Sequence, residues 1–162
     1  MPDLASPYTL TTPGGTVQFN NEQMDRFNIP GGPDEFYISD IQGLDGPPIR
    51  APVDNRPQTD GGLVHPFFKG PRRVTIEGCL MIRSTRIGDA MRLIRNDMEK
   101  ELKDALESIL AADGTLSWTV PYTAGTDAFS LTVRNEIPVE FRGIELKTFV
   151  FGLIAADPDY DA

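Results

Sequence analysis

Carboxylates are the residues of this sequence whose number and spacing come nearest to a site that could do chemistry. Asp40, Asp45, Asp54 and Asp60 fall in or beside a stretch that is rich in proline and glycine. Carboxylate oxygens are ligands that Ca²⁺ prefers, but this series lacks the fixed spacing of an EF-hand loop. Aspartates are also common in turns, where their side chains bond to the local backbone. We therefore interpret these four as turn-forming or solvated residues and predict no metal site.

The sequence holds one histidine, His65, and one cysteine, Cys79. A zinc site needs more ligands of these types than two isolated residues can supply. Neither a Gly-x-Ser-x-Gly nucleophile elbow nor a Gly- and Lys-containing phosphate loop occurs in the chain. We predict that the protein is not an enzyme and has no cofactor, and that Cys79 is a small structural residue.

The protein is acidic, with a formal net charge of -9 at pH 7 and a pI of about 4.5. Binding to nucleic acid irrespective of sequence depends on basic residues that displace counterions, so this function is not expected. No apolar run is long enough to span a membrane, and no signal-peptide pattern opens the chain. We therefore expect no membrane association and no cleaved secretory signal, and at 162 residues the simplest organisation is a single domain.

A strand followed by a long helix organises the chain between residues 70 and 114. Val74, Ile76, Leu80 and Ile82 share one side of the strand, which is typical of a half-buried β-strand. The apolar period then lengthens and predicts an amphipathic helix over 86–112, which we expect Gly114 to stop. The apolar stripe of this helix consists of Ile87, Met91, Ile94, Met98, Leu102, Leu106 and Ile109. One strand cannot bury this stripe, so the helix must lie across a sheet.

Further strands are predicted on both sides of this unit. Residues 1–35 are expected to form an arm or short strands around a Pro-Gly-Gly turn, and residues 36–41 a strand that leads into a long loop. Strands are also expected over 115–120 and 129–133, with a turn-rich connection over 122–127. The last strand, over 144–155, is apolar on both faces, with Leu146, Val150 and Ile154 on one and Phe149, Phe151 and Leu153 on the other. A strand of this kind packs between two layers or meets another subunit.

The order of strands, one helix and more strands lacks the regular alternation of a doubly wound fold. We predict an α+β fold, an antiparallel β-sandwich with one long flanking α-helix.

A resemblance to a known family rests on four runs of the sequence, which are Ile41–Arg50, Asp60-Gly61-Gly62, Gly70–Gly78 and Leu153–Tyr160. In their order and spacing they resemble the amino-terminal domain of siphophage distal tail proteins and related phage minor tail proteins. The resemblance covers residues 36–160, which we expect to be a distal-tail-like β-sandwich with its helix. Longer members carry a carboxy-terminal domain that resembles a carbohydrate-binding module. The chain leaves no residues for it, so we expect no receptor binding by this protein.

The resemblance implies a structural virion protein, made in the host cytoplasm and located in the phage tail. Members form hexameric rings that join the tail tube to the tail tip or baseplate, with arms that reach the neighbouring subunit. The implied partners are copies of the same chain, the tail tube protein, the tip or baseplate hub and the tape measure protein. DNA passes through such a ring without specific binding, and the negative charge of this chain suits that passage by repulsion.

The residues expected to carry function are therefore those of a subunit interface. Arginines can make bidentate contacts to carboxylates across a boundary, and prolines stiffen a loop for an ordered contact. The predicted interface residues are Arg50, Arg72, Arg73, Pro47, Pro48, Phe149, Phe151 and Leu153.

Two alternative functions stay open at this point. A tail tube or tail terminator protein could use the same sandwich and helix, and its copies would stack into filaments. A carbohydrate-binding module could use Trp118, Tyr122 and the nearby loops. An enzyme with an unrecognised carboxylate site is disfavoured, because the sequence offers neither a nucleophile motif nor a metal-ligand set.

Overall fold

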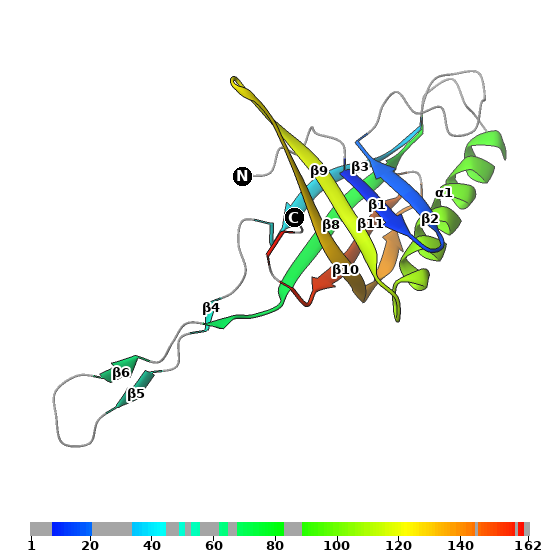
Figure 1. The fold of residues 1–162 in the computed structure, drawn as a ribbon. Helices are drawn as coiled ribbons and strands as arrows, with labels where there is room; N and C mark the ends of the chain where they lie inside the picture. The colour runs from blue at the N-terminus through cyan, green and yellow to red at the C-terminus, as the bar shows by residue number, and fades with distance from the viewer. Residues whose placement is uncertain are drawn as a thin grey trace.

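Seven strands form a closed β-barrel in the computed structural model of this protein (Figure 1). The structure describes residues 8–20, 34–44, 49–50, 53–55, 62–64, 68–82, 89–144, 146–157 and 159–160. The barrel strands are β1 (Tyr8–Thr12), β2 (Gly15–Phe19), β3 (Glu35–Gln42), β8 (Arg72–Met81), β9 (Gly114–Tyr122), β10 (Gly125–Arg142) and β11 (Thr148–Ala155). Their order around the barrel is β1-β2-β3-β8-β11-β10-β9.

The predicted antiparallel sandwich is thus corrected to a closed barrel, while the single long helix among strands is confirmed. The sheet closes because β1 pairs with β2 on one side and with β9 on the other. All barrel pairings are antiparallel except β2 with β3, a parallel contact made through the pair Phe19 and Phe36. Alternating apolar residues indicate one buried face per strand, and a sandwich and a barrel both satisfy that pattern.

The helix α1 spans Asp89–Ser108 and is shorter at its C-terminal end than the predicted 86–112, whose first residues lie outside the described part. After Ser108 the backbone tightens, since the Ile109 and Leu110 N–H groups donate to carbonyls three residues earlier. The Ile109 carbonyl then accepts a hydrogen bond from the Asn135 N–H, and this bond connects the end of the helix to β10. The apolar stripe is confirmed for its buried members Ile94, Met98, Leu102, Leu106 and Ile109, while Ile87 lies outside the described residues.

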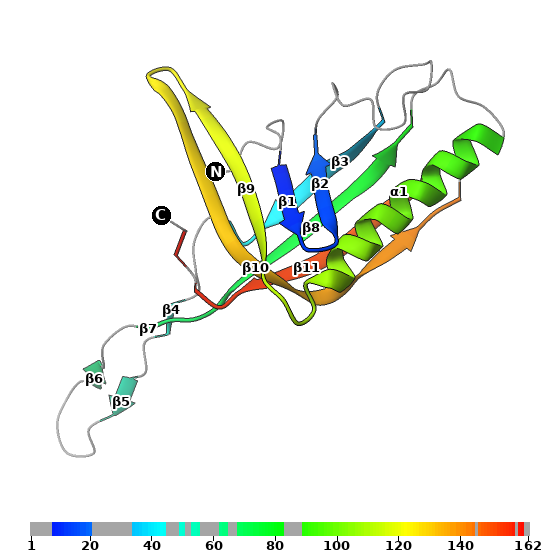
Figure 2. The ribbon, with the colours of Figure 1, turned by 45° about the vertical axis from the view of Figure 1, so that its right-hand side comes forward.

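The helix packs against β1, β2 and β10. Figure 2 shows the helix beside the short β1–β2 hairpin. The helix lies along a part of the sheet that this hairpin does not cover. Gly114 was predicted to stop the helix. It is instead the first residue of β9. An added Cβ there would lie 2.9 Å from Ile109 Cγ2, so the glycine serves the close packing of β9 against the helix end.

The strand β8 behaves as its alternation predicts. Val74, Ile76 and Leu80 are buried in the core, whereas Arg73 and Glu77 are exposed. Gly78 occupies an inward position where no side chain fits, because an added Cβ would lie 2.0 Å from the carbonyl oxygen of Tyr37. This close approach occurs beside the irregularity in the pairing of β3 with β8. The strand predicted over 36–41 is confirmed as β3.

The connection predicted over 122–127 is instead part of a long hairpin. β9 and β10 pair from Gly114 with Val133 out to Tyr122 with Gly125, leaving only Thr123 and Ala124 in the turn. Pro121 belongs to this hairpin although it has no N–H. The tolerance has a physical reason, because β1 ends its described pairing with β9 at Trp118, and no other described strand pairs with the outer edge of β9 beyond it.

The final strand begins later than predicted. β11 starts at Thr148, and Ile144 and Leu146 precede it with 85% and 58% of their surface exposed. The run is therefore not a two-faced strand from residue 144, because its first residues form the connection from β10. Within β11 the side chains of Phe149, Phe151 and Leu153 point into the core, and Val150 and Ile154 are half-buried on the other face.

Candidate assembly surfaces

The outer half of the β9–β10 hairpin projects beyond the barrel, and we call residues 119–128 the arm (Figure 2). Every arm residue is exposed apart from half-buried Val120, and Tyr122 near the tip is 57% exposed. A two-stranded ribbon without a hydrophobic face against a third element is only marginally stable in water. A partner that packed against the arm would therefore add to its stability.

A second projection leaves the barrel between β3 and β8. Its described parts are β4 (Ile49–Arg50), which pairs with β7 (Phe68–Lys69), and β5 (Val53–Asn55), which pairs with β6 (Gly62–Val64). We call these four strands the extension. Figure 1 shows it directed away from the barrel, on the side opposite the helix. The long loop predicted here is thus partly built of antiparallel pairs.

Exposed apolar side chains gather beside the C-terminal end of the helix. Leu110 is 55% exposed and Ile137, on the bulged part of β10, is 54% exposed. A shallow groove of about 170 Å³ lies between these elements and is lined by Lys103, Leu106, Glu107, Leu110, Asn135, Pro138 and Val139. Sequence reasoning missed this surface. The only sequence feature that could have indicated this surface is Pro138, which interrupts an otherwise alternating strand.

The turn from β10 to β11 is fastened to the helix. Lys147 Nζ lies 3.1 Å from Glu99 Oε1, and both side chains are largely shielded. Arg95 also donates a hydrogen bond to the Ile144 carbonyl oxygen. Ile144 and Leu146 are consequently held out at this end of the barrel as exposed apolar residues.

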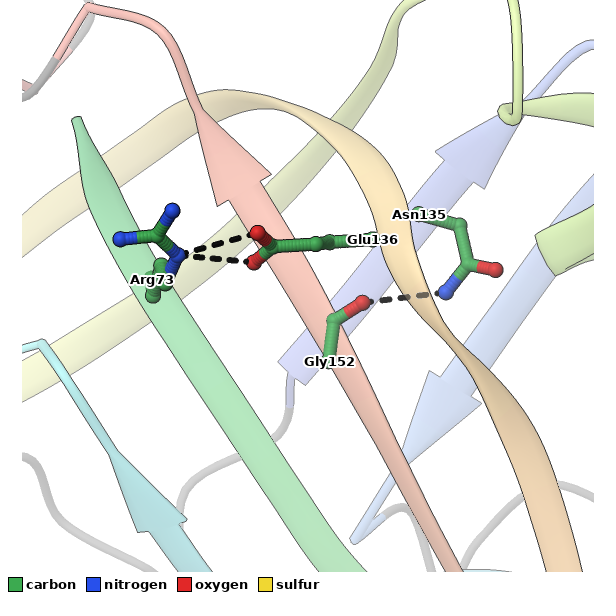
Figure 3. A network of polar contacts seen from close by, with 4 residues as sticks. All are labelled: Arg73, Asn135, Glu136 and Gly152. Carbon is green, nitrogen blue, oxygen red and sulfur yellow. Dashed lines mark hydrogen bonds and ion pairs between the residues drawn. The ribbon is translucent and has the colours of Figure 1, made fainter.

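Two polar contacts bind β8, β10 and β11 together (Figure 3). Arg73 Nε lies 3.0 and 3.1 Å from the two carboxylate oxygens of Glu136 and so joins β8 to β10 across β11. The Asn135 side-chain amide donates to the Gly152 carbonyl oxygen at 3.0 Å. It also donates to the Ile137 carbonyl oxygen at 2.9 Å. Asn135 is 8% exposed, so this second contact is internal to the barrel wall.

The structure assigns most of the predicted interface residues to the protomer itself. Phe149, Phe151 and Leu153 are at most 2% exposed, and packing in their own core leaves them no surface to offer a neighbouring subunit. Arg72 is 3% exposed and donates to the Leu44 carbonyl oxygen at 2.9 Å. Arg73 is exposed but already engages Glu136.

The remaining predicted interface residues are Arg50, Pro47 and Pro48. Arg50 contributes its main chain to β4, and Pro47 and Pro48 lie outside the described residues. An interface involving these three therefore stays a prediction.

No group of three or more His, Cys, Asp or Glu side chains that could hold a metal ion occurs among the described residues. In the acidic series, Asp40 accepts a hydrogen bond from Gln42 at 2.9 Å, which fits the interpretation of a local turn or surface carboxylate. Asp54 lies in β5, and Asp45 and Asp60 fall outside the described part of the chain, as does His65.

Trp118 lies in the core and not on a binding surface. It is 5% exposed and stacks between Tyr8 and Phe129, with ring centroids 6.0 and 5.7 Å away. Sugars bind to proteins by stacking on an exposed aromatic face, and the neighbours of Trp118 occupy both of its faces. Tyr122 is exposed, but it lies beyond this cluster on the arm, so the two residues predicted for a carbohydrate site do not form one.

Within the described residues, no helix is both long enough and apolar enough to cross a bilayer.

Comparison with known proteins gives a structural likeness without a sequence relative. No protein family's sequence profile matches the chain, and no curated protein matches it either. Among solved structures, the chain is similar to the Dit protein of phage SPP1, described as a paradigm of the hub adsorption apparatus in phages that infect Gram-positive bacteria. The TM-score is 0.55 at 11% sequence identity. The alignment covers 93% of this chain and 50% of that one, so this chain spans about half the length of the SPP1 protein. This likeness shows a Dit-like fold.

Proposed function

We propose that this protein is a structural subunit of the tail of a long-tailed phage, a ring-forming distal tail or minor tail protein that joins the tail tube to the tip or baseplate. The observation that carries the proposal is the Dit-like fold over 93% of the chain. The four sequence runs that resemble siphophage distal tail proteins support the same family separately. Two separate kinds of evidence therefore support one class of protein.

The shape of the protomer supports assembly as its role. A compact barrel carries two projections, the arm and the extension, and each is too thin to bury a core of its own. In the proposed ring, the arm of one subunit contacts the next subunit. The exposed apolar residues Leu110, Ile137 and Tyr122 are the surfaces that such contacts would cover.

The partners follow from the same proposal. They are further copies of this chain in a hexamer, the tail tube protein on one side, and the tip or baseplate hub with the tape measure protein on the other. DNA crosses the lumen unbound, because a subunit with a net charge of -9 repels phosphates. The protein would be made in the host cytoplasm and reside in the virion, and it would act without catalysis.

Light scattering after size exclusion, with negative-stain images of the same peak, tests the proposal. We expect a discrete species of about six 17.8 kDa protomers that forms rings with a central hole. Open-ended tubes would favour the tail tube function over the adaptor function. A protein that stays monomeric both alone and with its tube and hub partners would contradict assembly altogether.

A variant at the arm tip sharpens this experiment. Tyr122→Ser should lower the ring fraction, because it removes a large aromatic side chain that is 57% exposed near the arm tip. The control is Lys100→Ser on the solvent face of the helix, where the side chain is also exposed and contacts Asp104. Both variants should keep the unfolding temperature of the protomer. Rings that form equally well with Tyr122→Ser would exclude the arm tip from the interface.

A further inference from the structure

The carbonyl oxygen of Leu44 accepts hydrogen bonds from two residues that are distant in the sequence. Arg72 Nη1 donates to it from 2.9 Å, and the Tyr160 hydroxyl donates from 2.5 Å. Leu44 and Arg72 are 2% and 3% exposed, so this junction lies inside the protein. One backbone oxygen therefore joins the end of β3, the start of β8 and the chain beyond β11.

The ring of Tyr160 is held as well as its hydroxyl. The Arg72 guanidinium carbon lies 4.5 Å from the ring centroid, which is a cation–π contact. The same ring meets Trp118 and Phe129 edge-on, with centroid separations of 5.6 and 5.1 Å. Tyr160 thereby links the segment that follows β11 to the β9–β10 hairpin at the point where this hairpin leaves the barrel.

This junction sits at the root of the extension. Gly43, just before Leu44, has a φ of 93° and approaches β8 so closely that an added Cβ would lie 1.9 Å from the Arg73 carbonyl oxygen. The chain leaves for the extension after Leu44 and returns through buried Gly70 to Arg72. The outgoing and returning strands of the extension thus meet where Arg72 and Tyr160 bind Leu44.

We propose that Leu44, Arg72 and Tyr160 form a latch that sets the direction of the extension. Tyr160 is its movable part, because it is 38% exposed and follows the last strand, whereas Arg72 is buried within β8. With Tyr160 seated, both chains at the root are fixed to the barrel. When the Tyr160 side chain leaves this position, the Leu44 carbonyl oxygen keeps one of its two hydrogen-bond donors. The extension is then free to reorient, and the barrel core stays closed.

The latch can be tested on the full-length protein with two variants of one residue. Tyr160→Phe removes the hydroxyl donor and keeps the ring, and Tyr160→Ala removes both. Tyr37→Phe and Tyr37→Ala are the matched controls, since Tyr37 is 45% exposed on β3 and makes none of these contacts. The readouts are amide hydrogen exchange in peptides that cover β4 and β7, trypsin cleavage after Lys69, and the fluorescence of Trp118, the only tryptophan.

We expect Tyr160→Phe to raise exchange and cleavage in the extension by about threefold to tenfold, as befits the loss of one hydrogen bond. Tyr160→Ala should raise them further and also change the Trp118 emission, because an aromatic ring leaves the indole. Exchange in α1 and in the β1–β2 hairpin should stay at the wild-type level. Unchanged exchange in β4 and β7 for both Tyr160 variants would overturn the latch. So would an equal rise throughout the barrel, because Tyr160 would then act only on global stability.

Discussion

The side-chain amide of Asn135 donates a hydrogen bond to the carbonyl oxygen of Gly152, 3.0 Å away, where β10 is bulged against β11. The backbone N–H of the same asparagine donates to the Ile109 carbonyl oxygen at the end of α1. Asn135 therefore provides hydrogen bonds to carbonyl groups at the bulge and at the helix end, where buried polar groups need partners.

Replacing Asn135 with alanine should lower the free energy of unfolding by about 1–3 kcal/mol, because the carbonyl oxygens of Ile137 and Gly152 each lose a buried donor. Denaturation by urea, followed by circular dichroism, measures the change. Glu136→Gln is the control next to it, since it weakens an exposed ion pair with Arg73 and should cost less than about 1 kcal/mol. Equal losses for the two variants would contradict the structural role of Asn135.

Replacing Gly78 with alanine should destabilise the barrel by about 1–3 kcal/mol or prevent folding, because the new methyl group overlaps the Tyr37 backbone and the Phe149 ring. Thermal unfolding compared with Cys79→Ala provides the measurement. Cys79 is the next residue of the same strand and faces the other way, so its truncation should cost much less. A Gly78→Ala protein as stable as wild type would show that β3 and β8 can separate at this point.

Replacing Phe151 with alanine should cost about 3–5 kcal/mol of protomer stability, the range for removing a fully buried aromatic side chain. The measurement is denaturant unfolding at a concentration where light scattering finds monomer. Ile144→Ala, at an 85% exposed site, is the control and should leave the protomer within about 0.5 kcal/mol of wild type. If Phe151→Ala altered only assembly and left the monomer intact, the original interface prediction for Phe149, Phe151 and Leu153 would be reinstated.

The thiol of Cys79 should react slowly with iodoacetamide at neutral pH. Burial, and to a lesser degree the nearby Glu35 carboxylate, raise the pKa of Cys79 above its ordinary value, so less thiolate is present. The labelling rate of the folded protein should therefore rise at a higher pH than that of the urea-unfolded chain. In the unfolded state the thiol ionises first, so any stability from keeping it neutral is complete below its ordinary pKa and declines as the pH rises. A folded-state profile shifted to lower pH would be inconsistent with this environment.

Local patterns predicted the elements whose burial repeats regularly. Val74, Ile76 and Leu80 alternate and Ile94, Met98 and Leu102 recur at the helical period, and each set faces the core as expected. Closure of the sheet was not predictable in the same way. It depends on β1 pairing with both β2 and β9, and the residues of β9 lie a hundred positions further along the chain. Pairing partners at such separations leave no mark in the local alternation of either strand.

The candidate interface residues show the same limit of sequence reasoning. Phe149, Phe151 and Leu153 were assigned to a subunit boundary because their strand is apolar on both faces, yet the barrel interior accounts for them. Arg72 was expected to contact carboxylates across a subunit boundary, but within the protomer Leu44 and Tyr160 provide it with a carbonyl and an aromatic ring. The arm could not be foreseen because Pro121 and a turn-rich composition are typical of a loop. This proline is acceptable in β9 because no described strand pairs with the outer edge of β9 at that position.

The single strand β10 belongs to two structures at once, since its first residues, 125–128, pair with β9 in the arm, and the rest of it pairs with β9 and then with β11 in the barrel wall. A load applied near Tyr122 is therefore carried along one covalent backbone into the barrel, with no irregular linker in between to absorb it. The connection that follows this strand is anchored to the helix through the ion pair of Lys147 with Glu99. A displacement of the arm tip would therefore be transmitted along β10 into the barrel wall.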